Sequence, residues 1–402
     1  MRKFLAAGAF LVLCASFCRL DAAHVVPVGD FRFLGGQYFF NSSASSLSGN
    51  LSLTVVPAVK FNDRFSIIPT YMGSYRGTKE VADLVGGGTL FQDGQDHFLS
   101  VKGVYAVTPA LKLKLGTSYR LELLRETKDE AWGKGLFDYQ KLNAGFETEY
   151  AYLRNGAIRA GIDYYTLRFP NYQSLESSVT SSGLGRELAG SDTLNCANLM
   201  GTLRFINSFG RLKTEVGYYT TAKSYPDQPL VLADSTLSKN KRNDSYTAIN
   251  TNVTCPVKTS PSLGIVVSLD AQYVLNDSNQ AHYDAQKTKF IADYYDYSYL
   301  VVAPTVHFII GKRPWAVSLG GSVNRQDYAK RPVQDADGTY QSGAITVDET
   351  MVSVGIAYPI GKNIKLRAVS NFIDSRSNMK YETTYAYNYQ TSNYLLGFNY
   401  EF

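Results

Sequence analysis

The chain has 402 residues, with 40 Lys and Arg against 35 Asp and Glu, and its formal net charge is +5. This near balance excludes the concentrated basic surface that nucleic-acid binding requires, so we expect no nucleic-acid partner. The aromatic residues are strongly weighted towards Tyr and Phe, with 30 Tyr and 21 Phe against 2 Trp.

The N-terminus begins with "MRK", continues with the apolar run "FLAAGAFLVLCASF" and then reaches small residues around Ala22 and Ala23. A basic start followed by a short apolar stretch is typical of a secretory signal peptide and is too short for a stop-transfer helix. We therefore predict a cleaved signal peptide over 1–22 and a single exported domain over 23–402.

Beyond this segment, apolar residues alternate with polar ones instead of forming the run of roughly 20 that a membrane helix needs. In "LKLKLGTSYRLEL", Leu111, Leu113 and Leu115 lie on one face, and Lys112 and Lys114 lie on the other. Alternation over ten or more residues indicates a strand longer than the usual five or six residues, in the range of about 9–11 that crosses a membrane. The pattern predicts sixteen strands, with fourteen as the alternative, over 32–41, 49–61, 65–76, 97–108, 111–123, 139–153, 156–169, 194–206, 210–223, 244–256, 262–275, 295–310, 315–328, 343–358, 364–376 and 389–402.

The connections between these strands alternate in length. Short links such as "NDR", "RNG" and "NSFG" are rich in turn formers, whereas "GTKEVADLVGGGTLFQDGQD" and "PNYQSLESSVTSSGLGRELAGSD" are long. This sorting is typical of a transmembrane, antiparallel, up-and-down β-barrel with short periplasmic turns and long extracellular loops. Within the first long loop, Val81, Leu84 and Val85 share one face of a short helix predicted around Lys79–Val85. Pro57 and Pro69 each remove a ladder donor, and their spacing about Asp63 predicts that they face each other across a hairpin.

The last strand ends on an aromatic residue and carries apolar side chains at alternate positions before it. These residues are Tyr394, Leu396, Phe398, Tyr400 and Phe402. In this respect the chain resembles the bacterial outer-membrane β-barrels, and more loosely the sixteen-stranded porins. The resemblance implies that these five residues form the signal read by the barrel assembly machinery, and that the protein lies in the outer membrane of a Gram-negative-type bacterium.

The alternation also predicts which charged side chains face the interior of the barrel. They are Lys112, Lys114, Arg120, Glu122, Glu147, Glu149, Arg159, Asp163, Lys213, Glu215, Asp270, Lys365 and Arg367. In a water-filled lumen such mixed charges line a weakly ion-selective path, for which we expect a modest anion preference. In a narrow barrel the same residues would instead form a salt-bridged plug. Whether loop 124–138, which would be the third outer loop, folds inward is also left open.

Motifs for chemistry are scarce. The four His residues show no metal-ligand spacing, and we expect no metal, no cofactor and no enzymatic activity. His97, beside Asp93 and Asp96, is the best catalytic candidate and a weak one. Cys196 and Cys255 are expected to be free thiols on strands two apart, with opposite facing.

The preferred function is therefore a channel for passive diffusion of small polar solutes. One alternative is a non-channel anchor or surface-binding barrel that acts through Tyr-rich extracellular loops such as "DYYDYSYL". Another is a transporter of hydrophobic compounds, in which "HVVPVGDFRFLGG" would reach inside. The expected partners are outer-membrane lipids, the barrel assembly machinery and small polar solutes, and an oligomer is left open.

Overall fold

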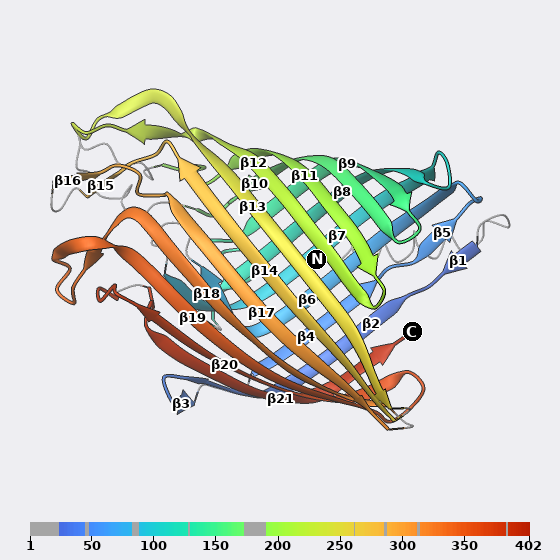
Figure 1. Ribbon diagram of the computed structural model, residues 1–402. Helices are drawn as coiled ribbons and strands as arrows, with labels where there is room; N and C mark the ends of the chain where they lie inside the picture. The colour runs from blue at the N-terminus through green and yellow to red at the C-terminus, as the bar shows by residue number, and fades with distance from the viewer. Residues whose placement is uncertain are drawn as a thin grey trace.

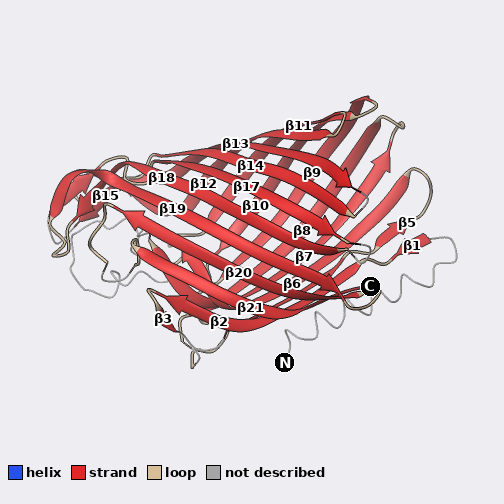
Figure 2. Cartoon of the chain, turned by 60° about the horizontal axis from the view of Figure 1, so that its bottom comes forward, coloured by secondary structure: helices blue, strands red, loops and turns tan. Residues whose placement is uncertain are grey.

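The computed structural model describes residues 24–44, 48–82, 88–127, 129–172, 190–260, 262–284, 288–311, 314–382 and 385–402. The signal peptide predicted over 1–22 lies outside these residues. Strands account for all regular structure in the described ranges, and Figure 2 accordingly shows no helix. In the part of the chain that is described, no helix is long and apolar enough to cross a membrane.

The strands follow the chain in a regular order. They are β1 (His24–Val26), β2 (Gly29–Phe40), β3 (Ser43–Ala44), β4 (Ser48–Val55), β5 (Ala58–Lys60), β6 (Phe65–Ala82), β7 (Thr89–Ala106), β8 (Leu111–Arg125), β9 (Tyr139–Leu153), β10 (Gly156–Arg168), β11 (Cys196–Phe209), β12 (Leu212–Val231), β13 (Leu237–Ser260), β14 (Leu263–Ser278), β15 (His282–Asp284), β16 (Lys289–Ile291), β17 (Tyr297–Ile310), β18 (Trp315–Gln334), β19 (Tyr340–Pro359), β20 (Ile364–Ser377) and β21 (Tyr389–Glu401).

Each strand pairs antiparallel with its neighbours, and the sheet closes on itself where β2 pairs with β21 from Asp30↔Glu401 to Phe40↔Thr391. Among the described residues the sheet has nineteen strands. Two of the barrel strands are interrupted: β1 and β2 form one, and β3, β4 and β5 form another, so the barrel has sixteen strands. This confirms the predicted closed, up-and-down antiparallel barrel and its count of sixteen. Figure 1 shows the two ends: β3, β15 and β16 lie at the end with the long loops, and β1 and β5 lie at the end with the short turns.

Closure is tight at the seam between β2 and β21. The backbones of Gly29 and Phe402 exchange two hydrogen bonds, of 2.8 and 3.0 Å. A Cβ added at Gly36 would collide with the carbonyl oxygen of Tyr394, and one added at Gly397 would collide with that of Phe33. The seam therefore depends on glycine because the two backbones approach each other too closely for a side chain between them.

The prolines interrupt the ladder where the sequence predicts. Val55 pairs with Tyr71 and Val59 pairs with Ile67, which leaves Pro57 and Pro69 facing each other in the gap between β4 and β5. Closing this gap would require a donor that neither proline has.

The outer face of the barrel is apolar. Leu115 and Leu396 are each 68% exposed, and similar residues continue around the wall: Leu142, Phe146, Tyr150, Ile162, Tyr164, Leu199, Tyr218, Val323 and Val352. A water-soluble protein rarely exposes such a continuous band, and only a closed sheet leaves no unpaired backbone groups in hydrocarbon.

The helix predicted around Lys79–Val85 is wrong for its described part. Strand β6 continues to Ala82 after a register shift between Arg76 and Lys79, and residues 83–85 lie outside the described residues. A strand is more stable than a helix here because Val81 pairs with Leu90 on β7, and both side chains pack on an apolar cluster at the mouth of the barrel.

Candidate functional site

A charged network covers the inner wall near the short-turn end, across β8 to β12. Lys114 Nζ lies 2.6 Å from Glu147 and 2.7 Å from Glu149. Glu149 also binds Arg159 at 2.7 Å and Lys112 at 3.5 Å. The structure therefore brings together five of the residues predicted to face inward, all from β8, β9 and β10.

Arg204 on β11 extends this network and is the residue that sequence reasoning missed. Its guanidinium lies 2.5 Å from Glu147 on β9 and 3.5 Å from Glu215 on β12. It reaches Glu147 diagonally across β10, where the residue opposite Glu147 is Gly161, which has no side chain. Arg204 is in phase with the inward face of its strand, so the same alternation could have identified it.

The network is half-buried, with Lys114 13% and Glu149 15% exposed at the side chain, whereas Lys112 is 44% and Glu215 is 37% exposed. Arg159 and Arg204 stand directly opposite each other in register, which would be repulsive without the carboxylates between them. Four cations surround three carboxylates, so the network carries a formal charge of +1.

Arg120 and Glu122 form a second group nearer the long-loop end. Arg120 makes a bidentate contact of 2.8 and 2.7 Å with Asp96 on β7, and lies 3.7 Å from Glu122. Glu122 is also paired with Lys79. Lys112, Lys114 and Arg120 lie on one strand, but they therefore belong to two separate networks.

The other predicted inward residues lie apart from both networks. Asp163 accepts a hydrogen bond from Asn143, Asp270 accepts one from Asn252 at 2.6 Å, and Lys365 pairs with Glu401 at 2.6 Å. Within the described part of the chain, Lys213 and Arg367 make no ion pair.

The β6–β7 hairpin leans into the mouth of the barrel. On one face, Phe91 packs on the inward-facing rings of Phe40 and Tyr389, with centroids 4.8 and 5.3 Å away. Glu80 on the same face accepts a hydrogen bond from Thr391 at 3.1 Å. These partners lie on β2 and β21. The described arms of the hairpin are therefore held against the inner face of these two strands, and they narrow the mouth of the barrel.

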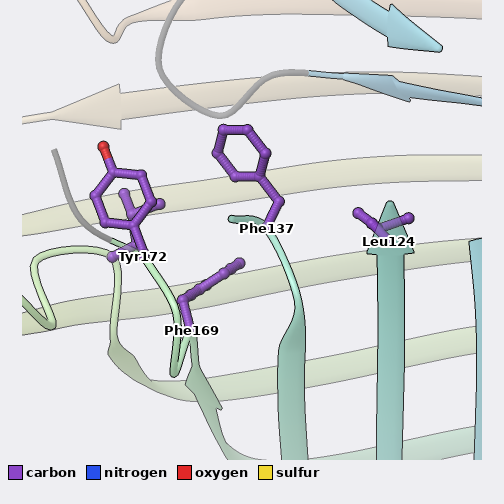
Figure 3. Packing of buried hydrophobic residues seen from close by; sticks show 5 residues of the cluster. Leu124, Phe137, Phe169 and Tyr172 are labelled. Atoms are coloured by element: carbon purple, nitrogen blue, oxygen red, sulfur yellow. The ribbon is translucent and has the colours of Figure 1, made fainter. Parts of the chain in front are cut away.

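The other face of the hairpin meets the apolar cluster formed by Leu124, Phe137, Phe169, Tyr172 and Leu194. Figure 3 labels four of these side chains, Leu124, Phe137, Phe169 and Tyr172, which gather where the neighbouring strands end. Within loop 124–138, Phe137 joins this cluster, but Trp132 lies over the outer face, with its ring 6.2 Å from Tyr75 and under the guanidinium of Arg125 at 4.4 Å. Trp132 therefore does not enter the lumen.

Stacked Arg and Tyr side chains pack along the wall of the mouth on the side of β12 to β18. Arg242 is buried, binds Asp244 through two hydrogen bonds of 2.8 and 2.7 Å, and lies over the rings of Tyr225 and Tyr295. Arg331 lies over the rings of Tyr294 and Tyr328, at 4.1 and 4.4 Å.

Beside this stack, in the connection that precedes β17, burial raises the pKa of the Asp296 carboxyl, which accepts a hydrogen bond from the Ser278 amide at 2.7 Å. These contacts tie the loops to the upper wall of the barrel.

Groups of three or more metal-ligating side chains are absent from the described ranges. His97 contacts the hydroxyl of Tyr71 through Nδ1 at 3.2 Å on the outer face, whereas Asp96 points inward to Arg120. Cys196 and Cys255 are free thiols, as expected.

A scan against protein-family models and a search of curated proteins gave no match. Among solved structures, in-vitro folded OmpT, an outer membrane protein of Vibrio cholerae, matches at 11% identity and a TM-score of 0.48, covering 96% of this chain and 99% of that one. OccAB3 of Acinetobacter baumannii matches at 8% identity and a TM-score of 0.43, covering 94% and 99%. The ferric citrate transporter FecA matches at 9% identity and a TM-score of 0.44, covering 93% and 64%. The likeness concerns the fold alone.

The prediction that the chain is not an enzyme is not upheld. One fold hosts many unrelated functions, so neither the barrel nor the lack of a local catalytic motif in the sequence decides the class of activity. The resemblance predicted from the sequence is confirmed at the level of the fold. The protein is a closed sixteen-stranded antiparallel barrel whose structural neighbours are bacterial outer-membrane β-barrel proteins.

Proposed function

We propose that the barrel spans the outer membrane of a Gram-negative-type bacterium, after removal of residues 1–22, and conducts small polar solutes through its lumen. The proposal includes outer-membrane lipids around the apolar band and recognition of the terminal strand by the barrel assembly machinery. The thirteen predicted inward charges, together with Asp96 and Arg204, would line the path.

The observation that carries this proposal is the exposure of charged groups on the inner wall. Lys112 and Glu215 remain more than a third exposed at the side chain, although both face into a closed barrel. Water reaching these groups favours an aqueous lumen, because a plugged barrel would bury them even where they are paired. Barrels of sixteen strands are wide enough to leave an aqueous channel.

The alternatives lose their specific support. In "DYYDYSYL", the ring of Tyr294 stacks under Arg331 and the ring of Tyr295 stacks under Arg242, so these rings do not form a free surface for a partner. The segment that could have entered the lumen as a plug, "HVVPVGDFRFLGG", instead forms β1 and the start of β2 within the wall.

Liposome swelling tests the proposal. Vesicles containing the refolded protein should swell in isotonic solutions of small sugars and amino acids, at rates that fall steeply with solute size. Vesicles containing heat-denatured protein are the control. Folded protein that leaves swelling at the control rate for every solute would refute conduction.

A further inference from the structure

A cavity of about 390 Å³ opens on the inner wall at mid-height, across β12, β13, β14 and β17. This volume falls in the range of roughly 300–1,000 Å³ that is typical of small-molecule sites. Its lining comprises Glu215, Gly217, Tyr219, Asn250, Thr251, Asn252, Asp270, Ala271, Gln272 and Val301.

The strand register arranges this lining in rows. The row nearest the short turns holds Glu215, Asn252 and Asp270, and the next row holds Gly217, Asn250 and Gln272. Since neighbouring strands lie about 4.8 Å apart, the backbones that carry Glu215 and Asp270 are separated by roughly 10 Å, with Asn252 between them. Such an arrangement suits a molecule with hydrogen-bonding groups at both ends.

Gly217 creates the hollow. A Cβ at this position would lie 2.7 Å from a ring carbon of Tyr219, so the ring lies down against the glycine backbone and presents an aromatic surface to the cavity. The Oδ1 atom of Asn250, in the same row, is buried without a hydrogen-bond partner among the described residues. The wall thus combines a ring, three amides and two carboxylates.

The two carboxylates of the lining are offset by nearby cations. Asp270 accepts from Asn252 at 2.6 Å, and Glu215 lies 3.5 Å from Arg204. Arg204 is shared with Glu147 in the charged network, whose formal charge is +1. Asp270 adds one negative charge to these surroundings, and Lys213, two residues before Glu215 on the same face of β12, adds one positive charge. A neutral ligand is favoured over a cation because the surroundings hold no excess of negative charge.

We propose that this cavity binds a neutral polyhydroxylated solute of the size of a mono- or disaccharide. The carboxylates accept hydrogen bonds from its hydroxyls, the amides donate and accept, and the ring of Tyr219 covers its apolar face. Charge-assisted hydrogen bonds of this kind are the stronger ones. The assignment names a solute class for the proposed channel and therefore rests on it in the cell, but binding itself does not require conduction.

Isothermal calorimetry in detergent tests binding without a membrane, with glucose, sucrose and maltose as probes and putrescine as a cationic comparison. Asp270→Asn and Asn250→Ala should each weaken sugar binding, by about tenfold for Asp270→Asn, since a charged hydrogen-bond acceptor becomes a weaker, neutral one. Gly217→Ala should weaken it by pushing the ring of Tyr219 into the cavity. Asn371→Ala, which removes an inner-wall amide on β20, is the matched control and should leave the affinity unchanged.

Sugar binding that falls in the three cavity variants but not in the control supports the inference. No sugar binding by a folded protein that nevertheless conducts would overturn the inference and leave the proposed channel intact. Tighter binding of putrescine than of any sugar would also overturn it, by showing that the site selects a cation. Sugar binding without conduction would support the site and refute the channel.

Discussion

The charged network on the inner wall makes a direct prediction about ion selectivity. Glu149 lies among Lys112, Lys114 and Arg159, within 3.5 Å of each. Glu149→Gln removes one negative charge and changes the formal charge of the network from +1 to +2. Lys114→Gln removes one positive charge and changes it from +1 to 0. The two variants should therefore shift selectivity in opposite directions.

The size of the effect follows from Coulomb's law. A unit charge about 6 Å from a passing ion contributes about 0.7 kcal/mol in water before screening. At roughly 0.1 M salt the Debye length is about 10 Å, which leaves about 0.4 kcal/mol. This energy raises the local concentration of one ion about twofold and lowers that of its counter-ion by the same factor. The ratio of anion to cation permeability should therefore change about three- to fourfold. At about 1 M salt, where the Debye length is about 3 Å, the change should shrink to about 1.4-fold.

Reversal potentials in planar bilayers under a KCl gradient measure this ratio. The wild type should show a modest anion preference, which Glu149→Gln should increase and Lys114→Gln should reduce. Asp63→Asn is the matched control because Asp63 pairs with Lys60 in an exposed turn, away from the lumen. Unchanged reversal potentials in both wall variants, with conductance retained, would refute the view that this network lines the conducting path.

Three further predictions concern assembly, the mouth and the seam. Deleting Phe402 should reduce barrel insertion while leaving export intact, as measured by the amount of heat-shifted band in membrane fractions; Phe402→Ala keeps the backbone bonds to Gly29, so normal insertion of that variant would show that the ring is not the signal. Phe91→Ala removes the ring that packs on Phe40 and Tyr389 and should raise single-channel conductance, whereas Phe146→Ala on the outer face should not; equal conductance in both variants would contradict a constriction by the hairpin. Gly397→Ala should destabilise the seam by about 1–3 kcal/mol and lower the temperature at which the compact gel band is lost, whereas Gly361→Ala, where a Cβ meets open space, should have no effect; equal stability of the two would contradict the close approach at the seam.

The sequence carries the fold well because alternation encodes both the strand and its facing. A strand in a closed barrel must present apolar side chains outward and polar ones inward, so the period of two identifies its length and its inner face at once. The strand over 111–123 is an example, since Lys112, Lys114 and Arg120 all make ion pairs on the inner wall.

Prediction is weaker at the long-loop end, where that constraint ends. The sequence pattern predicts that β6 stops at 76 and that β7 begins at 97, whereas β6 continues to Ala82 and β7 begins at Thr89. Beyond the apolar band a strand needs no strict alternation, and "KEVADLV" has the apolar spacing of a helix. The conformation of its described part, residues 79–82, is decided by pairing with β7 and by contacts with β2 and β21, which are distant in sequence.

The sequence predicts which charged side chains face the lumen, but it does not predict which of them form ion pairs with each other. Which carboxylate meets which cation depends on the register between strands and on small residues such as Gly161, and a single sequence fixes neither. The cavity beside Tyr219 has the same origin, since the hollow exists only because Gly217, Asn250 and Gln272 are placed in one row by pairing. Its residues are scattered over four strands.

Single-channel recording of the refolded protein tests the central claim most directly. A folded barrel runs as a compact band on SDS gels before heating and shifts after boiling. Protein that passes this check should produce discrete, stable conductance steps in planar bilayers, and the size of the steps should rise roughly in proportion to salt concentration. The same folded preparation giving no steps, at any voltage the bilayer tolerates, would contradict an open lumen.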